Sequence, residues 1–296
     1  MSGNIVKTKA ELLFPSNCTL AESPLWHREQ NSCFWVDIEG CSIYEYDWLT
    51  KDVKLYELTH RVSLIVQGKG DELILGLQGG IGRYNLATEN LEWIRGMEVN
   101  WKTHRCNDGG CDSRGRLWVG TMELTHKHGA GTLYCVDVDG RVEKKIEHVS
   151  ISNGMIWSDD NKRLYYIDSP TRRVDSYLYD EGRGDISFER TVILLDQNVM
   201  PDGMTIDEEG MLWVALWGGF GVGRFNVNSG RMVSFIELPV PQVTSCAFVG
   251  EKLDQLLITT ARENMTAADI SKYPQSGNIF IAQVDARGIP NHRCAL

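Results

Sequence analysis

Side chains that carry oxygen recur at one position of a repeated pattern in this chain. Glu22, Asn107, Asn153 and Asp202 each lie eleven to thirteen residues before the centre of a short apolar run, and Thr244 occupies the same position in a fifth copy. Two carboxylates and two amides could together form a cage for calcium, magnesium or manganese. Singly, Asn-Gly and Asp-Gly are turn dipeptides and Glu22 could be a solvated surface charge. Their common position favours a shared site.

Further polar side chains lie on the segments that border these positions. Arg105 precedes Asn107 by two residues, and Glu123 follows the next apolar run. Both could donate or accept hydrogen bonds with a polyhydroxylated ligand, although either could be an ordinary surface charge. His126 and His128 come shortly after Glu123 and could also contact a ligand, or could simply be solvated.

The apolar runs that position these residues recur six times. Their centres are separated by 39, 44, 48, 47 and 44 residues and lie at Trp35, Ile74, Trp118, Tyr166, Trp213 and Leu257. This interval is typical of the blades of a β-propeller. We therefore expect an all-β fold in which residues 1–296 form a single six-bladed propeller with four antiparallel strands per blade. A β-sandwich would not account for six nearly equal intervals.

The last repeat lacks a convincing fourth strand before the chain ends. Residues 11–14, Glu-Leu-Leu-Phe, precede the first complete repeat and could supply that strand. Pairing of segments from the two ends of the chain would close the ring and cover its exposed strand edges. The innermost strands of a propeller surround its axis, so Glu22, Asn107, Asn153 and Asp202 should meet near one mouth of the central channel.

Composition narrows the possible partners and location. The 296 residues include 40 acidic and 30 basic side chains, a formal net charge of −10. This balance argues against nucleic acid or an anionic membrane as a partner. No apolar stretch is long enough to cross a membrane and no secretory signal is evident, so we expect a soluble, cytoplasmic protein. The eight cysteines contain no Cys-x-x-Cys pair and are expected to be reduced, mostly buried thiols.

Motifs for other enzyme chemistries are missing from the sequence. There is no Gly-x-Ser-x-Gly nucleophile motif, no P-loop, and no Gly-x-Gly-x-x-Gly at a strand-to-helix turn. A serine nucleophile and a nucleotide cofactor are therefore not expected.

In its motifs the chain resembles the family of senescence marker protein (regucalcin) and gluconolactonase. The long loop after the last apolar run, from Thr260 to Pro274, looks most like that of bacterial aldonolactonases. The motifs that carry the resemblance are Ala21-Glu22-Ser23-Pro24-Leu25-Trp26, Arg105-Cys106-Asn107-Asp108-Gly109, Arg116-Leu117-Trp118-Val119-Gly120-Thr121-Met122, Ser152-Asn153-Gly154, Pro201-Asp202-Gly203 and Ala215-Leu216-Trp217-Gly218-Gly219.

This resemblance implies a six-bladed propeller that hydrolyses a small-molecule sugar lactone. It assigns one divalent cation to Glu22, Asn153 and Asp202, with Asn107 beside it. Calcium is the foremost candidate, and magnesium, manganese, zinc and iron are alternatives. The resemblance also makes Asp202 the candidate general base and assigns substrate contacts to Arg105, Asn107 and Glu123. The oligomeric state is left open.

Three other functions remain compatible with the sequence. The same cation could serve a phosphotriesterase-like hydrolase, because a site that polarises a carbonyl group also polarises a phosphoryl oxygen. The apolar runs also resemble those of non-catalytic interaction propellers, although such a scaffold does not need four oxygen-bearing side chains on one axis. The third alternative is a calcium-binding protein without lactone turnover.

Overall fold

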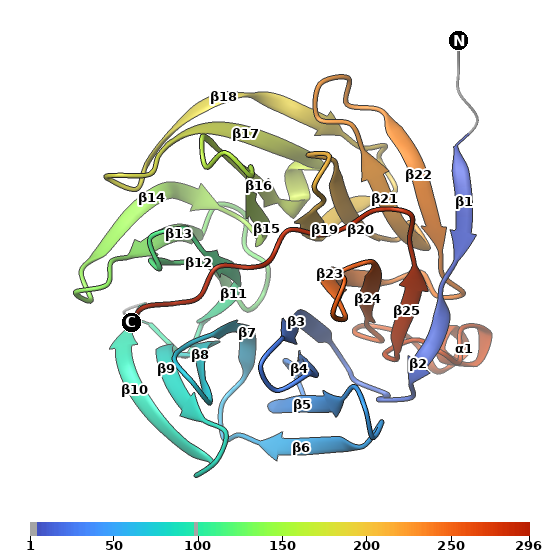
Figure 1. Ribbon diagram of the computed structural model, residues 1–296, viewed down its shortest axis with the longest axis horizontal. Helices are drawn as coiled ribbons and strands as arrows, with labels where there is room; N and C mark the ends of the chain where they lie inside the picture. The colour runs from blue at the N-terminus through green and yellow to red at the C-terminus, as the bar shows by residue number, and fades with distance from the viewer. Residues whose placement is uncertain (1–4, 98–99) are drawn as a thin grey trace.

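Six β-sheets surround a common centre in this protein (Figure 1). The structure is a computed structural model that describes residues 5–97 and 100–296. Each of the six apolar runs forms the second strand from the axis of its sheet: β4, β8, β12, β16, β20 and β24. The predicted six-bladed propeller with four antiparallel strands per blade is confirmed.

The first three blades follow one another along the chain. Blade 1 contains β3 (Ala21–His27), β4 (Ser32–Asp37), β5 (Ser42–Asp47) and β6 (Val53–Glu57). Blade 2 contains β7 (Val62–Gln67), β8 (Glu72–Leu77), β9 (Gly80–Asn85) and β10 (Asn90–Gly96). Blade 3 contains β11 (His104–Cys111), β12 (Leu117–Glu123), β13 (Gly131–Val136) and β14 (Val142–Val149).

The other three blades complete the ring. Blade 4 contains β15 (Ser152–Trp157), β16 (Arg163–Asp168), β17 (Arg173–Asp180) and β18 (Asp185–Leu194), with the 3-10 turn η1 (Ser169–Thr171) after β16. Blade 5 contains β19 (Met200–Ile206), β20 (Leu212–Trp217), β21 (Gly221–Phe225) and β22 (Met232–Glu237). Blade 6 contains β23 (Val243–Val249), β24 (Gln255–Thr260), β25 (Ile279–Gln283) and β2 (Glu11–Phe14).

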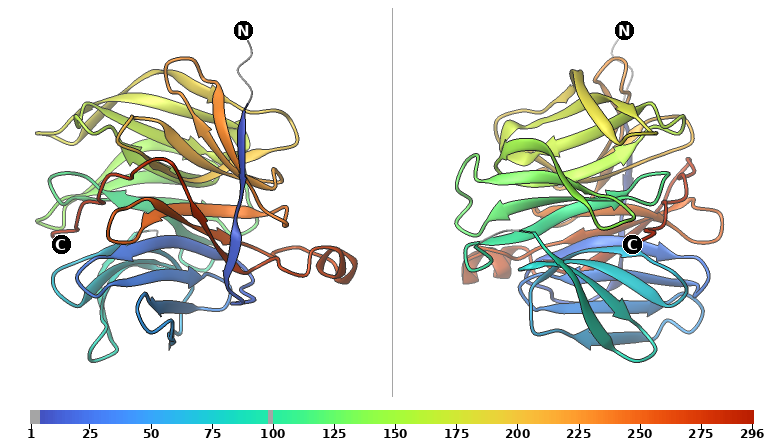
Figure 2. Two further views of the ribbon diagram at one scale, coloured as in Figure 1. Left: turned by 45° about the vertical axis from the view of Figure 1, so that its right-hand side comes forward. Right: turned by 90° about the vertical axis from the view of Figure 1, so that its left-hand side faces the viewer.

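The N-terminal segment pairs with two blades. Strand β2 pairs antiparallel with β25, which confirms the predicted closure of the ring. Strand β1 (Val6–Lys9) pairs in parallel with β22 and gives blade 5 a fifth strand, which the sequence did not lead us to expect (Figures 1 and 2). All four residues of β1 are exposed, so this strand has no apolar face that a sequence pattern would reveal.

The core lies between neighbouring blades, because both faces of the second strands are covered. In β12, Leu117 and Val119 pack with Ile74 of blade 2. Between them, Trp118 faces the opposite way and packs with Trp157 of blade 4. This alternation follows from the two-residue period of a strand. All eight cysteines are free thiols and all except Cys41 are buried.

Helical structure is sparse, and the short helix α1 (Ala267–Lys272) projects beyond the ring in the long connection between β24 and β25 (Figure 2). Within residues 5–97 and 100–296, no helix has the length and apolar character needed to cross a membrane.

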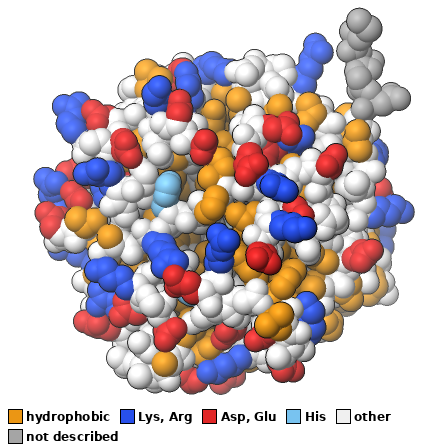
Figure 3. Space-filling view, in the orientation of Figure 1, with side chains coloured by type: hydrophobic (Ala, Val, Ile, Leu, Met, Phe, Trp, Pro, Cys, Tyr) orange, Lys and Arg blue, Asp and Glu red, His pale blue; other side chains and the backbone are white. Residues whose placement is uncertain are grey.

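The C-terminal tail, residues 285–296, crosses one face of the ring (Figure 1). The amide of Cys294 donates to Gln67 O at 2.8 Å, and the amide of Ala295 donates to Gly115 O at 2.9 Å. The space-filling view shows this face, with acidic and basic side chains interspersed around its rim (Figure 3).

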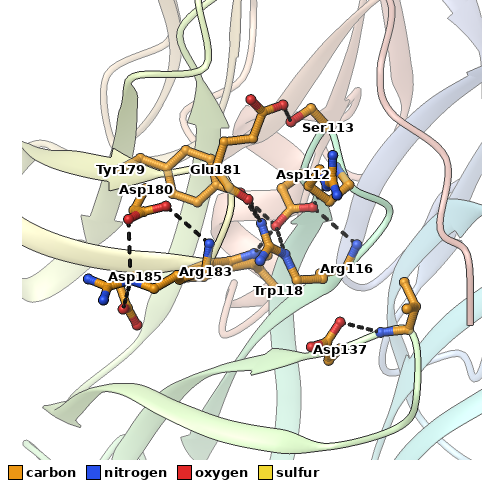
Figure 4. A network of polar contacts seen from close by, with 12 residues as sticks. Asp112, Ser113, Arg116, Trp118, Asp137, Tyr179, Asp180, Glu181, Arg183 and Asp185 are labelled. Carbon is orange, nitrogen blue, oxygen red and sulfur yellow. Dashed lines mark hydrogen bonds and ion pairs between the residues drawn. The ribbon is translucent and has the colours of Figure 1, made fainter.

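A buried carboxylate joins blade 3 to blade 4 (Figure 4). Asp112 accepts hydrogen bonds from Arg116 Nε at 2.6 Å, Tyr179 Oη at 2.7 Å and Trp118 Nε1 at 2.9 Å. Arg116 Nη2 in turn donates to Glu181 O, in the hairpin between β17 and β18. Because Asp112 is fully buried, its charge depends on these partners.

We expect Asp112→Ala to reduce the free energy of unfolding by about 3–5 kcal/mol, the usual cost of removing one partner of a buried ion pair. The control is Asp137→Ala, because Asp137 forms its ion pair with Arg141 at the solvent-exposed surface. That variant should lose no more than about 1 kcal/mol. Guanidinium chloride unfolding of both variants makes the comparison, and similar losses would contradict the role given to Asp112.

The innermost strands approach one another closely at the axis. A Cβ atom added to Gly203 in β19 would lie 2.0 Å from Ser245 Oγ and 2.9 Å from Ser245 Cα in β23. Glycine therefore allows the two strands to pack at this distance.

We expect Gly203→Ala to lower the free energy of unfolding by about 1–3 kcal/mol, as other overpacked sites do. Gly96→Ala in β10 is the matched control, because the nearest atom to its added Cβ would be Gly79 O at 3.7 Å. Urea unfolding curves measure the difference. Equal midpoints for the two variants would show that β19 and β23 separate at no cost.

Candidate functional site

Every innermost strand carries a bulge near the same end. The pairing register shifts between Glu22 and Leu25, Val62 and Leu64, Cys106 and Gly109, Ser152 and Met155, Pro201 and Met204, and Val243 and Ser245. Asn107, Asn153 and Asp202 lie inside such a shift, and Glu22 lies at the edge of one. Bulges redirect side chains and are frequent beside active sites. The common position seen in the sequence is therefore a common bulge.

These bulges bring the predicted residues to one cavity of about 260 Å³, which Glu22, Arg105, Asn107, Asn153 and Asp202 all line. Each of the five is only 5% to 8% exposed. The segments that follow the second strands complete the wall with His126, Ser169, Glu263 and Asn264, together with Trp217 at the end of β20. The cavity is thus polar at its base and bordered by loops from several blades.

A second cavity, of about 130 Å³, occupies the other end of the central channel. Residues from all six innermost strands line it, among them Asp108 and Gln67, and Ile289 and His292 of the tail border it. The tail therefore lies across the end of the channel opposite the candidate site.

Hydrogen bonds connect the polar side chains across blades 3, 4 and 5. Arg105 Nη1 donates to Asn107 Oδ1 and to Cys106 O. Asn107 Nδ2 donates to Asn153 Oδ1 at 3.3 Å, and Asn153 Nδ2 donates to Ser169 Oγ at 2.8 Å. Ser169 Oγ donates to the backbone of blade 5, at Pro201 O, at 2.7 Å. This chain of contacts holds both amides in defined orientations.

The site gathers negative charge in a buried place. Burial and, to a lesser extent, the charge of Asp202 raise the pKa of Glu22 well above its ordinary value. Burial followed by the charges of Asp108 and Glu263 raises the pKa of Asp202 well above its ordinary value. Burial also raises the pKa of Asp108 to about 6 and lowers the pKa of Arg105. Arg105 is the one cation among these five described residues, so the carboxylates lack sufficient counter-charge.

The residues present fit a divalent cation. Asp202 Oδ1 is a buried oxygen without a hydrogen-bond partner among the described residues. Glu22 and Asn153 line the same cavity and add a carboxylate and an amide oxygen, which are donors that calcium and similar hard cations prefer. The described part of the chain has no metal-binding arrangement of three or more His, Cys, Asp or Glu side chains. The proposed cation ligands fall outside that definition, because Glu22 and Asp202 supply only two carboxylates and the third ligand is the amide oxygen of Asn153.

Two residues noted in the sequence lie elsewhere. Glu123 is not among the residues that line the cavity, and its carboxylate accepts hydrogen bonds from Thr125 N at 2.7 Å and Thr125 Oγ1 at 2.6 Å. Its contact with substrate stays a prediction. Thr244 is also outside the cavity lining, and its hydroxyl donates to Ala21 O at 2.6 Å. Of the two histidines, His126 lines the cavity and His128 does not.

The structure also adds residues to which the sequence assigned no individual role. Glu263 lies in the loop after β24 and Trp217 is the last residue of β20, but nothing in their spacing distinguished them from their neighbours. Asp108 follows Asn107 directly and adds a half-buried carboxylate near Glu22 and Asp202. Its place directly after Asn107 was the signal that the sequence offered.

Comparison with known proteins agrees with this architecture. Residues 20–262 match the family described as SMP-30/Gluconolactonase/LRE-like region. The Bacillus subtilis (strain 168) protein that carries the name sugar lactone lactonase YvrE is 36% identical over 274 residues, which cover 92% of this chain and 94% of that protein. Regucalcin of Oryctolagus cuniculus is 34% identical over 295 residues, which cover 97% of this chain and 98% of that protein.

A solved structure is similar along the whole chain. It is regucalcin from Agrobacterium tumefaciens strain C58, described as a calcium-binding protein, with a TM-score of 0.94 and 26% identity over 99% of this chain and 100% of that one. Together with the extent of the family match, these similarities show that the chain belongs to the SMP-30/gluconolactonase/LRE-like family.

Proposed function

We propose that this protein hydrolyses a sugar lactone, an aldonolactone such as glucono-, xylono- or arabinonolactone, with the help of a divalent cation. The observation that carries the proposal is the buried Asp202 Oδ1, which has no hydrogen-bond partner within residues 5–97 and 100–296 and lies in a cavity that Glu22, Asn153 and Arg105 also line. Membership of a family with relatives named lactonase supports it.

Asp202 is the base in this proposal. A lactone is a cyclic ester, so hydrolysis adds water to the carbonyl carbon and breaks the ring C–O bond. Asp202 accepts the proton that the attacking water loses, a contribution typically worth about 10² to 10⁴ in rate. Burial raises the pKa of the Asp202 carboxyl, which makes its carboxylate a stronger base, and a bound cation would lower that pKa.

Arg105 and Asn107 bind and orient the substrate. The described hydrogen bonds of the Arg105 guanidinium use Nη1, so its other N–H groups can donate to a substrate hydroxyl or to the oxyanion. Asn107 is held by Ser152 O at 2.6 Å and keeps Arg105 in place through its own carbonyl oxygen.

Glu22, Asn153 and Asp202 would hold the cation, which would polarise the lactone carbonyl and make water more acidic. Calcium is the first candidate, and magnesium, manganese, zinc or iron would also suit this donor set. Calcium binding without turnover is a second candidate function, because the similar solved regucalcin is described as a calcium-binding protein.

We expect protein dialysed against a chelator to lose at least about 99% of its lactone hydrolysis and to recover it when a divalent cation is added. Acid release in weakly buffered indicator measures turnover over a panel of aldonolactones, with one phosphotriester included. Undiminished activity in metal-free protein would contradict the cation's role, and preference for the phosphotriester would replace the lactone as substrate.

Thermal unfolding distinguishes calcium binding without turnover, the second candidate function, from lactone hydrolysis. Because the cation binds only the folded site, a concentration one hundred times its Kd should stabilise the protein by about 2.7 kcal/mol. Calcium that raises Tm without any lactone turnover would favour a non-catalytic calcium-binding protein.

We expect Asp202→Asn to lower kcat by about 10² to 10⁴, because the amide keeps an oxygen ligand but cannot accept the proton. Arg105→Lys should chiefly raise KM, with a smaller loss in kcat. Asp139→Asn, in an exposed turn, removes the same charge away from the site and serves as the control. Steady-state kinetics on the best lactone tests the assignment. An Asp202→Asn variant that keeps more than about a tenth of kcat would place the base elsewhere.

A further inference from the structure

Glu263 occupies a firmly held position at the wall of the candidate site. It follows β24, lines the 260 Å³ cavity and is half-buried. Gln242 Nε2 donates to Glu263 O at 3.0 Å, and the amide of Ala261 donates to Gln242 O at 3.0 Å. Ala261 also forms an isolated bridge with Leu20, beside blade 1. The backbone that carries Glu263 is therefore fixed on two sides.

The side-chain carboxylate of Glu263, in contrast to its backbone, has no polar partner among the described residues. No hydrogen bond or ion pair to its side-chain oxygens occurs among the described residues, although the backbone around it is well connected. Its charge nevertheless acts on the site. Burial lowers the pKa of Arg105, and Glu263 is foremost among the carboxylates that oppose this effect. Glu263 also contributes to the raised pKa of Asp202.

The charges around the cavity determine how the carboxylate of Glu263 affects a neutral or an anionic ligand. Glu22, Asp202 and Glu263 line the cavity with the single guanidinium of Arg105, and Asp108 adds a further carboxyl group near Glu22 and Asp202, so acidic groups outnumber basic ones there. An uncharged lactone experiences no charge repulsion in such a site. Hydrolysis breaks its ring C–O bond, creates a hydroxyl and a carboxylate, and releases one proton. The product is thus an anion in a partly buried cavity that already contains Glu263, where like charges repel more strongly than in water.

We propose that Glu263 selects uncharged lactones over anionic ones and favours release of the anionic product. This inference rests on the function proposed above for the site. Glu263 acts through its charge and has no part in proton transfer.

Equilibrium binding tests the charge effect without turnover. D-gluconate and D-glucitol share one carbon chain and differ in charge, so calorimetry compares their Kd values for the calcium-loaded protein and its variants. We expect Glu263→Gln to tighten gluconate binding about tenfold and to change glucitol binding less than about twofold. Glu263→Asp keeps the charge and should behave as the unmodified protein.

Glu251→Gln is the matched control. Glu251 is exposed in the turn between β23 and β24, at the opposite end of these strands from Glu263. The same charge is removed, so an equal gain in gluconate affinity would show a non-specific effect of net charge and would overturn the inference. A Glu263→Gln variant that weakens both ligands alike would make Glu263 a hydroxyl-binding residue and would also overturn it, as would the lack of binding by either ligand.

Kinetics provides the second measurement. Relative to gluconolactone, we expect phosphogluconolactone to gain about tenfold in kcat/KM in Glu263→Gln, and the gain should diminish at high salt. An unchanged ratio of kcat/KM for phosphogluconolactone to kcat/KM for gluconolactone would overturn the proposal that Glu263 selects uncharged lactones. Failure of the unmodified protein to hydrolyse any lactone would count against the proposed function, whereas the gluconate and glucitol comparison would still decide the role of Glu263.

Discussion

Close packing of six strands around one axis is the constraint on which the rest of this structure depends. The innermost strands approach so closely that a side chain at Gly203 would collide with Ser245. Each of these strands also bulges at the same level, which interrupts its pairing and turns polar side chains toward the channel. Tight packing and a local break in pairing together create a small polar cavity inside an otherwise apolar ring.

Placing carboxylates in that cavity is costly, because burial disfavours their charged forms. Glu22, Asp202 and Asp108 all have raised pKa values for this reason. Arg105 offsets part of this cost, and hydrogen bonds hold the Asn107 and Asn153 amides in place within the same cavity. In the functions that we propose, this unfavourable charge balance would help to bind a cation and to distinguish charged from uncharged ligands.

Such a site needs a stiff support, and the outer parts of the fold supply it. The apolar faces of the second strands pack on both neighbouring blades. Asp112 joins blade 3 to blade 4 by accepting a hydrogen bond from Tyr179. Strands β1 and β2 cover the edges of blades 5 and 6.

From the sequence alone, the six repeats, their four-strand blades and closure by residues 11–14 could be predicted, because apolar periodicity and turn residues are local signals. The common position of Glu22, Asn107, Asn153 and Asp202 was visible for the same reason. Only the tertiary structure decided that β1 joins blade 5, that Glu123 lies outside the cavity lining and that Glu263 lies within it. Those outcomes depend on bulges, loop paths and contacts between distant segments, which no local spacing encodes.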